Sequence, residues 1–170
     1  MGIHAEIVLG LDPGRDKIGF AAVRRDKSFL FSGILPALED AVWARALGRE
    51  GDIREIFSPW LRECPASNTE RLTLSLIVVG NGTCSGTLLD AVRRCASCEV
   101  LCVDEHGTTL EARKLYWCLH RPAWWQRLLP QGMRVPPRPL DDLAAWAIAN
   151  RGMDRAGERC ACPFGAHNEV

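Results

Sequence analysis

The sequence lacks the features that mark membrane, secreted or strongly charged proteins. No apolar run in its 170 residues approaches the roughly 18 needed to span a bilayer. Its first residues show no basic segment followed by an apolar stretch, so no secretory signal is expected. The formal net charge is zero, which excludes a global field that would attract the chain to nucleic acid or membranes. We therefore expect a cytoplasmic protein that does not bind membranes.

Lysine is also scarce, whereas cysteine is frequent. The chain has three lysines against eighteen arginines, and arginine suits phosphate and carboxylate groups. A genome rich in GC codons would produce the same bias. The eight cysteines are expected as thiols in a reducing cytosol. Two groups contain only part of a zinc-site spacing, and structural or incidental thiols are the simpler interpretation: Cys95, Cys98 and Cys102, and Cys160 and Cys162.

Two apolar runs near the start of the chain predict adjacent strands. The first, over residues 7–11, leads directly to Asp12. Pro13 and Gly14 break the line, and residues 18–23 form the second run. This pattern predicts a strand, a tight turn and an antiparallel strand. A buried Asp12 would have to be paired, hydrogen-bonded or bound to a cation. The alternative is that it only shapes the turn.

The remaining pattern predicts a single α/β domain over residues 1–152, followed by a flexible tail over 153–170. The further elements expected from apolar spacing are a strand over 28–35, a helical region over 36–61, a polar loop over 62–70, a strand over 72–80, a helix over 87–96, a strand over 99–103 and helices over 108–119 and 140–150. We predict a mixed five-stranded sheet, three antiparallel strands then two parallel ones, with helices on both faces. Right-handed crossovers place strand 72–80 beside the first strand and strand 99–103 beyond it.

Acidic residues fall at three element ends that this topology can bring together. They are Asp12 after the first strand, Asp104 and Glu105 after the fifth, and Asp141 and Asp142 at the start of the last helix. Converging carboxylates repel one another, so such a cluster is expected chiefly where divalent cations bind. Two cations about 4 Å apart can stabilise the attacking and leaving oxygens of a phosphodiester and activate a water. For each position alone an ordinary explanation stays open, because helix N-termini and loops favour acidic residues.

Four short motifs occur in order along the chain: LDPG with IGFA at 11–14 and 18–21, VVGNGT at 78–83, VDEHGTTLEA at 103–112 and DDLAAWAI at 141–148. The first, third and fourth resemble the successive acidic motifs of the RuvC/YqgF family of nucleases, which have an RNase H-like fold. The second resembles the corresponding segment of the YqgF-like domain in the transcription accessory protein Tex. The resemblance covers roughly residues 7–150 and implies a Holliday junction resolvase-like or precursor-RNA-processing nuclease.

Carried over residue by residue, the resemblance implies a catalytic, metal-binding triad of Asp12, Glu105 and Asp141 that holds Mg²⁺ or Mn²⁺. Asp142 is the alternate catalytic residue at the third position, because helices of RuvC type can present a second Asp there. The family pattern favours Glu105 over Asp104. Adjacent strand residues also face opposite ways, so only one of these two is expected to point into the site.

The chain departs from the family pattern at three places. His106 stands where the family has arginine, and Asn81 replaces a proline. The strand over 72–80 also lacks the glutamate that RuvC has there. These differences leave the acids intact and bear on the type of substrate and on activity. His106 could assist proton transfer or contact phosphate, or it could be an uninvolved histidine near a strand end.

Basic and aromatic residues, with no acidic one, occupy the stretch from Ala112 to Leu140. The candidates for nucleic-acid binding are Arg113, Lys114, Arg121, Trp124, Trp125, Arg127, Arg134 and Arg138. Arginine contacts phosphates and aromatic rings stack on bases, which would let a neutral protein bind a polyanion locally. Prolines predict a long loop over 120–139. The alternative is a loop that its tryptophans fix to the body, with solvated arginines between them.

The sequence therefore favours a metal-dependent nuclease acting on structured nucleic acid, either branched DNA or RNA. A non-catalytic nucleic-acid-binding module of the YqgF/Tex type is the alternative, although such a module has no need of a repulsive acidic cluster. A phosphotransferase of the actin and sugar-kinase type shares the Asp-x-Gly turn but needs two such domains, which 170 residues do not accommodate. A homodimer is also open, because symmetric cutting of a four-way junction requires two active sites.

Overall fold

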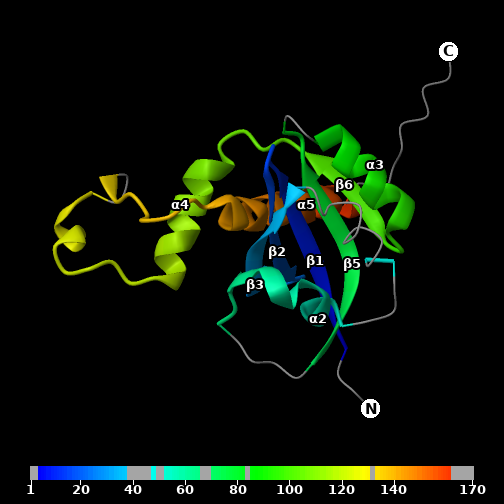
Figure 1. The fold of residues 1–170 in the computed structure, drawn as a ribbon, viewed down its shortest axis with the longest axis horizontal. Helices are drawn as coiled ribbons and strands as arrows, with labels where there is room; N and C mark the ends of the chain where they lie inside the picture. Colours follow the sequence, from blue (N-terminus) through cyan, green and yellow to red (C-terminus); the bar gives the residue numbers. More distant parts are fainter. Residues whose placement is uncertain are drawn as a thin grey trace.

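The computed structural model describes residues 4–37, 47–48, 52–65, 70–82, 85–130 and 133–161. Six strands form one mixed sheet in the order β4-β3-β2-β1-β5-β6 (Figure 1). They are β1 (His4–Pro13), β2 (Lys17–Arg24), β3 (Phe29–Pro36), β4 (Leu61–Glu63), β5 (Arg71–Gly80) and β6 (Glu99–Val103). Strands β1 to β4 pair antiparallel in sheet order, whereas β5 runs parallel to β1 and β6 parallel to β5.

The described helices are α2 (Ile53–Phe57), α3 (Ser85–Cys95), α4 (Thr108–Leu119) and α5 (Asp141–Ala161). Two short 3-10 turns, η2 (Ser58–Trp60) and η3 (Gln126–Leu128), lie between them. The α/β class and the mixed sheet confirm the prediction, and so do the places of β5 beside β1 and of β6 beyond it. Of the helical region predicted over 36–61, residues 38–46 and 49–51 lie outside the described ranges.

The predicted strand count was wrong, because the sheet has six strands rather than five. The additional strand, β4, begins at Leu61 and extends into the stretch predicted to be a polar loop. It pairs antiparallel with β3, Ser32 opposite Glu63 and Gly33 opposite Leu61. A strand of three residues at a sheet edge is too short to show an alternating pattern, so its apolar spacing carried no signal.

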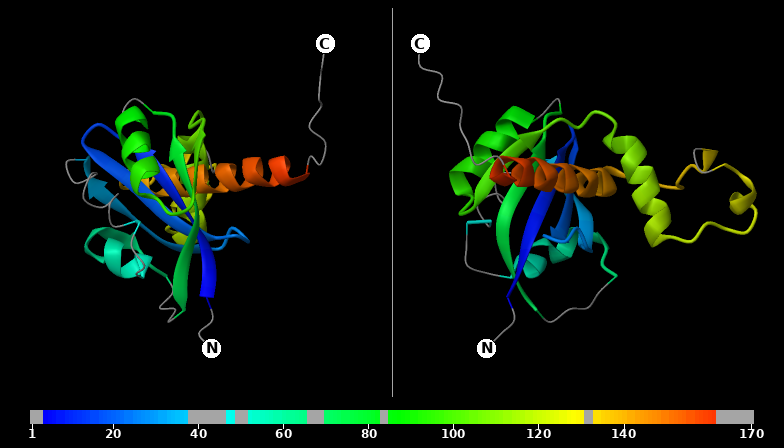
Figure 2. Two further views of the ribbon diagram at one scale, coloured as in Figure 1. Left: turned by 90° about the vertical axis from the view of Figure 1, so that its right-hand side faces the viewer. Right: turned by 180° about the vertical axis from the view of Figure 1, so that it is seen from behind.

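The sheet separates two layers of helices because its central strand β1 is apolar on both faces. Ile7, Leu9 and Leu11 belong to a core cluster that includes residues of α2 and α3. Val8, which points the opposite way, belongs to a second cluster with residues of α4 and α5. Figures 1 and 2 accordingly show α2 and α3 on one face of the sheet and α5 on the other. The prediction of helices on both faces is confirmed.

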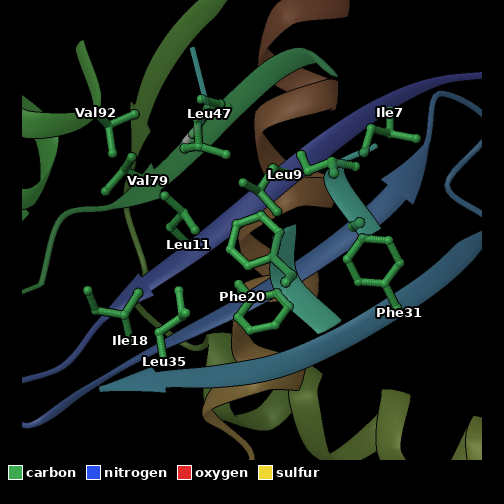
Figure 3. Close-up of a cluster of buried hydrophobic side chains, with 14 of the residues drawn as sticks. Ile7, Leu9, Leu11, Ile18, Phe20, Phe31, Leu35, Leu47, Val79 and Val92 are labelled. Carbon is green, nitrogen blue, oxygen red and sulfur yellow. The ribbon is translucent and has the colours of Figure 1, made fainter. Parts of the chain in front are cut away.

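Aromatic rings fill the first of these cores, where β2 and β3 meet α2 (Figure 3). The ring of Phe20 stacks on that of Phe57 with a centroid distance of 4.6 Å. Phe31 meets Phe20 edge-on, with centroids 6.5 Å apart. All three side chains are fully buried. These contacts hold the short helix α2 on the sheet, since five residues would not form a stable helix alone.

Two glycines let α5 lie directly on the sheet. A Cβ on Gly10 of β1 would lie 2.0 Å from the carbonyl oxygen of Ala145 in α5. A Cβ on Gly152 of α5 would lie 2.2 Å from the side chain of Val78 in β5. A glycine inside a helix costs about 1 kcal/mol relative to alanine, so Gly152 indicates that close packing is favoured over helix propensity here.

Helix α5 is longer than predicted, because it ends at Ala161 rather than near Asn150. It therefore includes the first part of the predicted tail, and residues 162–170 lie outside the described ranges. Figure 2 shows the end of α5 extending past the sheet. Asp154, Arg155 and Gly157 are exposed there. A helix segment with no sheet beneath it needs no apolar stripe, which explains why periodicity did not predict it.

Helix α4 and the segment that follows it project away from the sheet (Figures 1 and 2). We call this segment, residues 120–139, the arm; residues 131–132 in it lie outside the described ranges. As predicted, it is largely irregular, with short 3-10 segments at η3 and at Met133. In the described part of the chain, no helix is long and apolar enough to cross a membrane.

Candidate active site

Asp12 lies at the C-terminal end of β1 on the face that α5 covers. Val8 and Gly10 belong to this face by their contacts, and strand residues two apart point the same way. Across the sheet Asp12 is paired with Gly19 of β2. A Cβ on Gly19 would lie 2.1 Å from the carbonyl oxygen of Asp141, so α5 begins directly over this pair. The absent side chain of Gly19 thereby lets Asp141 approach Asp12.

Glu105 follows β6 and points to the same end of the sheet. Its backbone N–H donates to Asn81 Oδ1 over 3.1 Å, and the Asn81 N–H donates to the Val103 carbonyl oxygen over 3.0 Å. Its carboxylate lies over two glycines, since a Cβ on Gly82 would be 2.8 Å from either carboxylate oxygen and one on Gly80 3.0 Å from Oε2. The loop after β5 therefore orients Glu105 and provides the space for its side chain.

The three acids interact electrostatically at Asp12. Burial first, and then the negative charges of Glu105 and Asp141, together raise the pKa of Asp12 to about 7 against the opposing charge of Lys17. Such effects require that the charges lie close together in a poorly solvated place. Glu105 Oε2 is buried and has no hydrogen-bond partner among the described residues. Asp12, Glu105 and Asp141 thus form one electrostatic cluster at the ends of three elements.

An ion pair with lysine balances part of this negative charge. Lys17 opens β2 after the turn that follows Asp12, and the Gly14 N–H donates to its carbonyl oxygen over 3.0 Å. The ammonium Nζ of Lys17 lies 2.6 Å from Asp141 Oδ2. The side chains of Lys17 and Asp141 are 40% and 33% exposed, so water reaches this pair.

Asp142 is adjacent to Asp141 in sequence but faces a different environment. Its side chain is fully buried and accepts a hydrogen bond from the Ser32 hydroxyl over 2.9 Å. The Arg138 guanidinium donates to both of its oxygens, over 2.7 Å to Oδ1 and 3.1 Å to Oδ2. The structure brings Asp12, Glu105 and Asp141 together, and it pairs Asp142 with Ser32 and Arg138.

Arg138 also connects α5 to the edge of the sheet and to α4. Its guanidinium donates to Glu63 Oε1 over 2.6 Å and lies 5.7 Å from the ring centroid of Tyr116. His120 Nε2 lies 2.9 Å from the same Glu63 oxygen. Burial alone would raise the pKa of Glu63, but the hydrogen bonds from Arg138 and His120 outweigh burial and hold it below its ordinary value. Arg138, predicted to bind nucleic acid, therefore has carboxylate partners on two elements.

The neighbours of Glu105 lie outside the acidic cluster. Asp104 is exposed, and its side chain accepts a hydrogen bond from the His106 N–H over 3.1 Å. His106 is exposed as well, and the Arg151 guanidinium donates to the carbonyl oxygens of both residues. Of the two acids after β6, Glu105 is thus the one beside Asp12.

The arm exposes much of its apolar surface. Its large exposed side chains are Trp124 (78%), Trp125 (52%), Leu128, Leu129, Met133 and Val135. Arg121 and Arg127 are exposed among them, as is Lys114 on α4, whereas Arg113 is half-buried. Arg134 differs from these residues because its guanidinium donates to the carbonyl oxygens of Leu129 and Arg127, and its own carbonyl oxygen accepts from the Trp117 indole. Trp117 and Arg134 therefore stabilise the arm, while the two exposed tryptophans face water.

The chemistry of the acidic cluster suits a hard divalent cation. Carboxylate oxygens are the ligands that Mg²⁺ and Mn²⁺ prefer, and Glu105 Oε2, a buried oxygen without a hydrogen-bond partner among the described residues, would be available to such a cation. In the arrangement that the structure describes, no group of three or more His, Cys, Asp or Glu side chains is placed to hold a metal ion. The donor set fits a cation, and the Lys17–Asp141 pair lies where that cation would need an oxygen.

No protein-family model matches the chain, and no curated protein matches its sequence. Sequence reasoning missed Lys17, which pairs with Asp141, and also Ser32 and Glu63, which contact Asp142 and its partner Arg138. Lys17 lies between the two halves of the first motif, and that position was the only available signal. Nothing in the sequence pointed to Ser32 or Glu63, because their roles depend on how the strands pair.

Proposed function

We propose that the protein is a metal-dependent nuclease that hydrolyses phosphodiester bonds in structured nucleic acid, with an RNase H-like fold of the RuvC/YqgF type. One observation supports this proposal most: burial and the nearby negative charges of Glu105 and Asp141 raise the pKa of the Asp12 carboxyl group to about 7. Carboxylates that only shaped a turn or a helix end would have no reason to converge in this way.

Asp12, Glu105 and Asp141 would hold the cations. When bound, Mg²⁺ or Mn²⁺ would neutralise the scissile phosphate and lower the pKa of a bound water. The chain itself provides the positions of the ligands. Asp12 is fixed at a strand end, Glu105 by the Asn81 hydrogen bond, and Asp141 by the close approach of α5 to Gly19. Ligands on strand and helix ends are held more precisely than ligands on free loops.

The arm would bind the nucleic acid away from the acids. Arg121, Arg127 and Lys114 are exposed and suited to phosphate contacts, and Trp124 and Trp125 present ring faces on which unpaired bases can stack. The stretch that carries these residues contains no acidic residue, so nothing along it repels a polyanion. Branched DNA and structured RNA both offer phosphates beside unpaired bases, and we propose this class of substrate.

A non-catalytic nucleic-acid-binding module is the second candidate, and the Lys17–Asp141 ion pair is the observation that favours it. An ammonium 2.6 Å from Asp141 neutralises the third acid without any metal. A protein that only binds nucleic acid could neutralise the charge of Asp141 with this lysine and would need no metal ion. The two candidates share the arm and differ in whether cations take part.

Cleavage assays separate the two candidates. Branched DNA, duplex DNA and RNA are incubated with Mg²⁺ or Mn²⁺ and either the wild type, Asp12→Asn or Asp16→Asn. Asp16 is the matched control, because it is an exposed aspartate in the turn that follows Asp12. The nuclease proposal requires metal-dependent cutting by the wild type and Asp16→Asn but not by Asp12→Asn. If all three proteins bind nucleic acid equally and none of them cuts it, the nuclease proposal is excluded and the non-catalytic binding module is the remaining candidate.

We also propose a cellular location and an assembly state for the protein. Cys95, Cys98, Cys102 and Cys118 are free thiols, which suits a reducing cytoplasm. Burial raises the pKa of the Cys98 thiol and so lowers its reactivity. We propose a cytoplasmic protein, and a homodimer if its substrate is a four-way junction that must be cut symmetrically.

A further inference from the structure

Lys17 interacts with two of the three clustered acids. Its ammonium lies 2.6 Å from Asp141 Oδ2, and the same positive charge lowers the pKa of Asp12 against the effects that raise it. The two acids lie on different elements, Asp12 at the end of β1 and Asp141 at the start of α5. One flexible cation therefore connects the first strand and the last helix at the point where the carboxylates converge.

This ion pair is weak in comparison with the pair between Arg138 and Asp142, the next residue of α5. Lys17 and Asp141 are 40% and 33% exposed, and exposed pairs contribute little because water and salt screen them. Asp142 is fully buried and accepts two hydrogen bonds from the planar fork of Arg138. A lysine is a point charge on a flexible stem and holds no fixed geometry. The Lys17 ammonium can therefore leave Asp141, whereas Arg138 cannot leave Asp142 without stranding a buried charge.

We infer that Lys17 is a displaceable counter-ion, which balances the acidic cluster in the metal-free protein and competes with the divalent cation for Asp141. This inference rests on the proposed function, because it concerns the same three acids. A cation bound to the Asp141 carboxylate would lie close to the Lys17 ammonium, which contacts Oδ2, and two cations so close repel one another. Lys17 would thus set the concentration of cation at which the site loads.

The first test compares Mn²⁺ binding, measured by calorimetry, in the wild type, Lys17→Met and Lys27→Met. Lys27 is a matched control because its Nζ forms the same kind of pair with an α5 aspartate, Asp154, at 2.5 Å. That pair is more exposed, at 46% and 60%, and lies far along the helix from Asp141. Removing the competing charge should tighten Mn²⁺ binding by Lys17→Met about two- to tenfold, whereas Lys27→Met should bind like the wild type.

The second test measures thermal unfolding with EDTA and with saturating Mg²⁺. Without divalent cations, Lys17→Met should melt below the wild type, because Asp12, Glu105 and Asp141 then repel one another without compensation. Saturating Mg²⁺ should raise the melting temperature of Lys17→Met by more than that of the wild type, because binding to the folded state stabilises it. Lys17→Gln, which keeps a polar side chain, serves as a second variant if Lys17→Met does not fold.

The outcomes distinguish this inference from the proposed function. Equal or weaker Mn²⁺ binding by Lys17→Met, with binding still abolished by Asp12→Asn, would overturn the role of Lys17 and leave the metal site intact. If the wild type shows no saturable Mn²⁺ binding, or if Asp12→Asn binds Mn²⁺ as the wild type does, both the role of Lys17 and the proposed metal site are overturned. Tighter binding by Lys17→Met, together with unchanged binding by Lys27→Met, supports the inference.

Discussion

Replacing Arg138 by methionine should destabilise the protein strongly, although the sequence predicted only a nucleic-acid contact for this residue of the arm. Its guanidinium donates to Asp142, whose side chain is fully buried, and to Glu63, which is 17% exposed. Breaking a buried pair by removing one partner costs about 3 to 5 kcal/mol, because the remaining charge is stranded. Ser32 still donates to Asp142 in this variant and keeps the loss within that range. In a chain of 170 residues the melting temperature should fall by about 6 to 20 °C.

Urea unfolding monitored by circular dichroism provides the free energies of unfolding. The matched control is Arg24→Met, because Arg24 pairs with a single carboxylate, Glu70, whose side chain is 33% exposed. That variant should lose no more than about 1 kcal/mol. The double variant Arg138→Met/Asp142→Leu removes both charges and should recover most of the stability. A loss below about 1 kcal/mol in Arg138→Met, or no recovery in the double variant, would refute the reasoning.

Three further predictions concern the site and the arm. Because the folded pKa of Asp12, about 7, lies above its unfolded value of 3.8, this group stabilises the fold at low pH and the contribution is lost as pH rises toward 7. Asp12→Asn should therefore stabilise the metal-free protein at pH 8 by about 2 to 4 kcal/mol and have little effect near pH 4. Gly19→Ala places a Cβ 2.1 Å from the Asp141 carbonyl oxygen and should cost about 1 to 3 kcal/mol in urea unfolding, with weaker Mn²⁺ binding. Arg127→Ala should weaken binding to single-stranded DNA and reduce the slope of log affinity against log salt by about 1.

Each of these predictions has a control within the chain. Asp16→Asn should leave the pH dependence of stability unchanged, and equal pH profiles for wild type and Asp12→Asn would contradict the buried environment of Asp12. Gly86→Ala, where a Cβ meets nothing within 4 Å, should not destabilise helix α3. Arg62→Ala removes an exposed arginine outside the arm and should keep the wild-type salt slope. An Arg127→Ala slope equal to that of Arg62→Ala would show that Arg127 makes no phosphate contact.

Much of the fold could be predicted because each of its central strands has a clear apolar pattern in the sequence. The apolar runs that became β1, β2 and β5 are long and continuous, since these strands are covered on both faces. The boundaries of α4 and β6 agree with the sequence prediction to the residue. The element ends that carry Asp12, Glu105 and Asp141 followed from the same patterns. The strand order brings the acids to one end of the sheet, and the right-handed crossover rule predicted that order.

The failures have a common cause, which is that they depend on contacts between elements. Strand β4 exists because β3 offers an unpaired edge, and three residues cannot show this alone. Helix α5 continues past the sheet, where no apolar stripe is required.

The sequence by itself determined the α/β class, the parallel placing of the last two strands and the chain positions of the candidate acids, because apolar periodicity and motif order are local properties. Only the tertiary structure decided which acids meet. Asp141 and Asp142 are indistinguishable by position in sequence, yet one pairs with Lys17 near Asp12 and the other is buried against Ser32 and Arg138. Successive helix residues point about 100° apart, so the side on which each aspartate lies depends on how α5 sits on the sheet. The glycines that set this contact, at positions 10, 19 and 152, acquire their meaning only when the helix is in place.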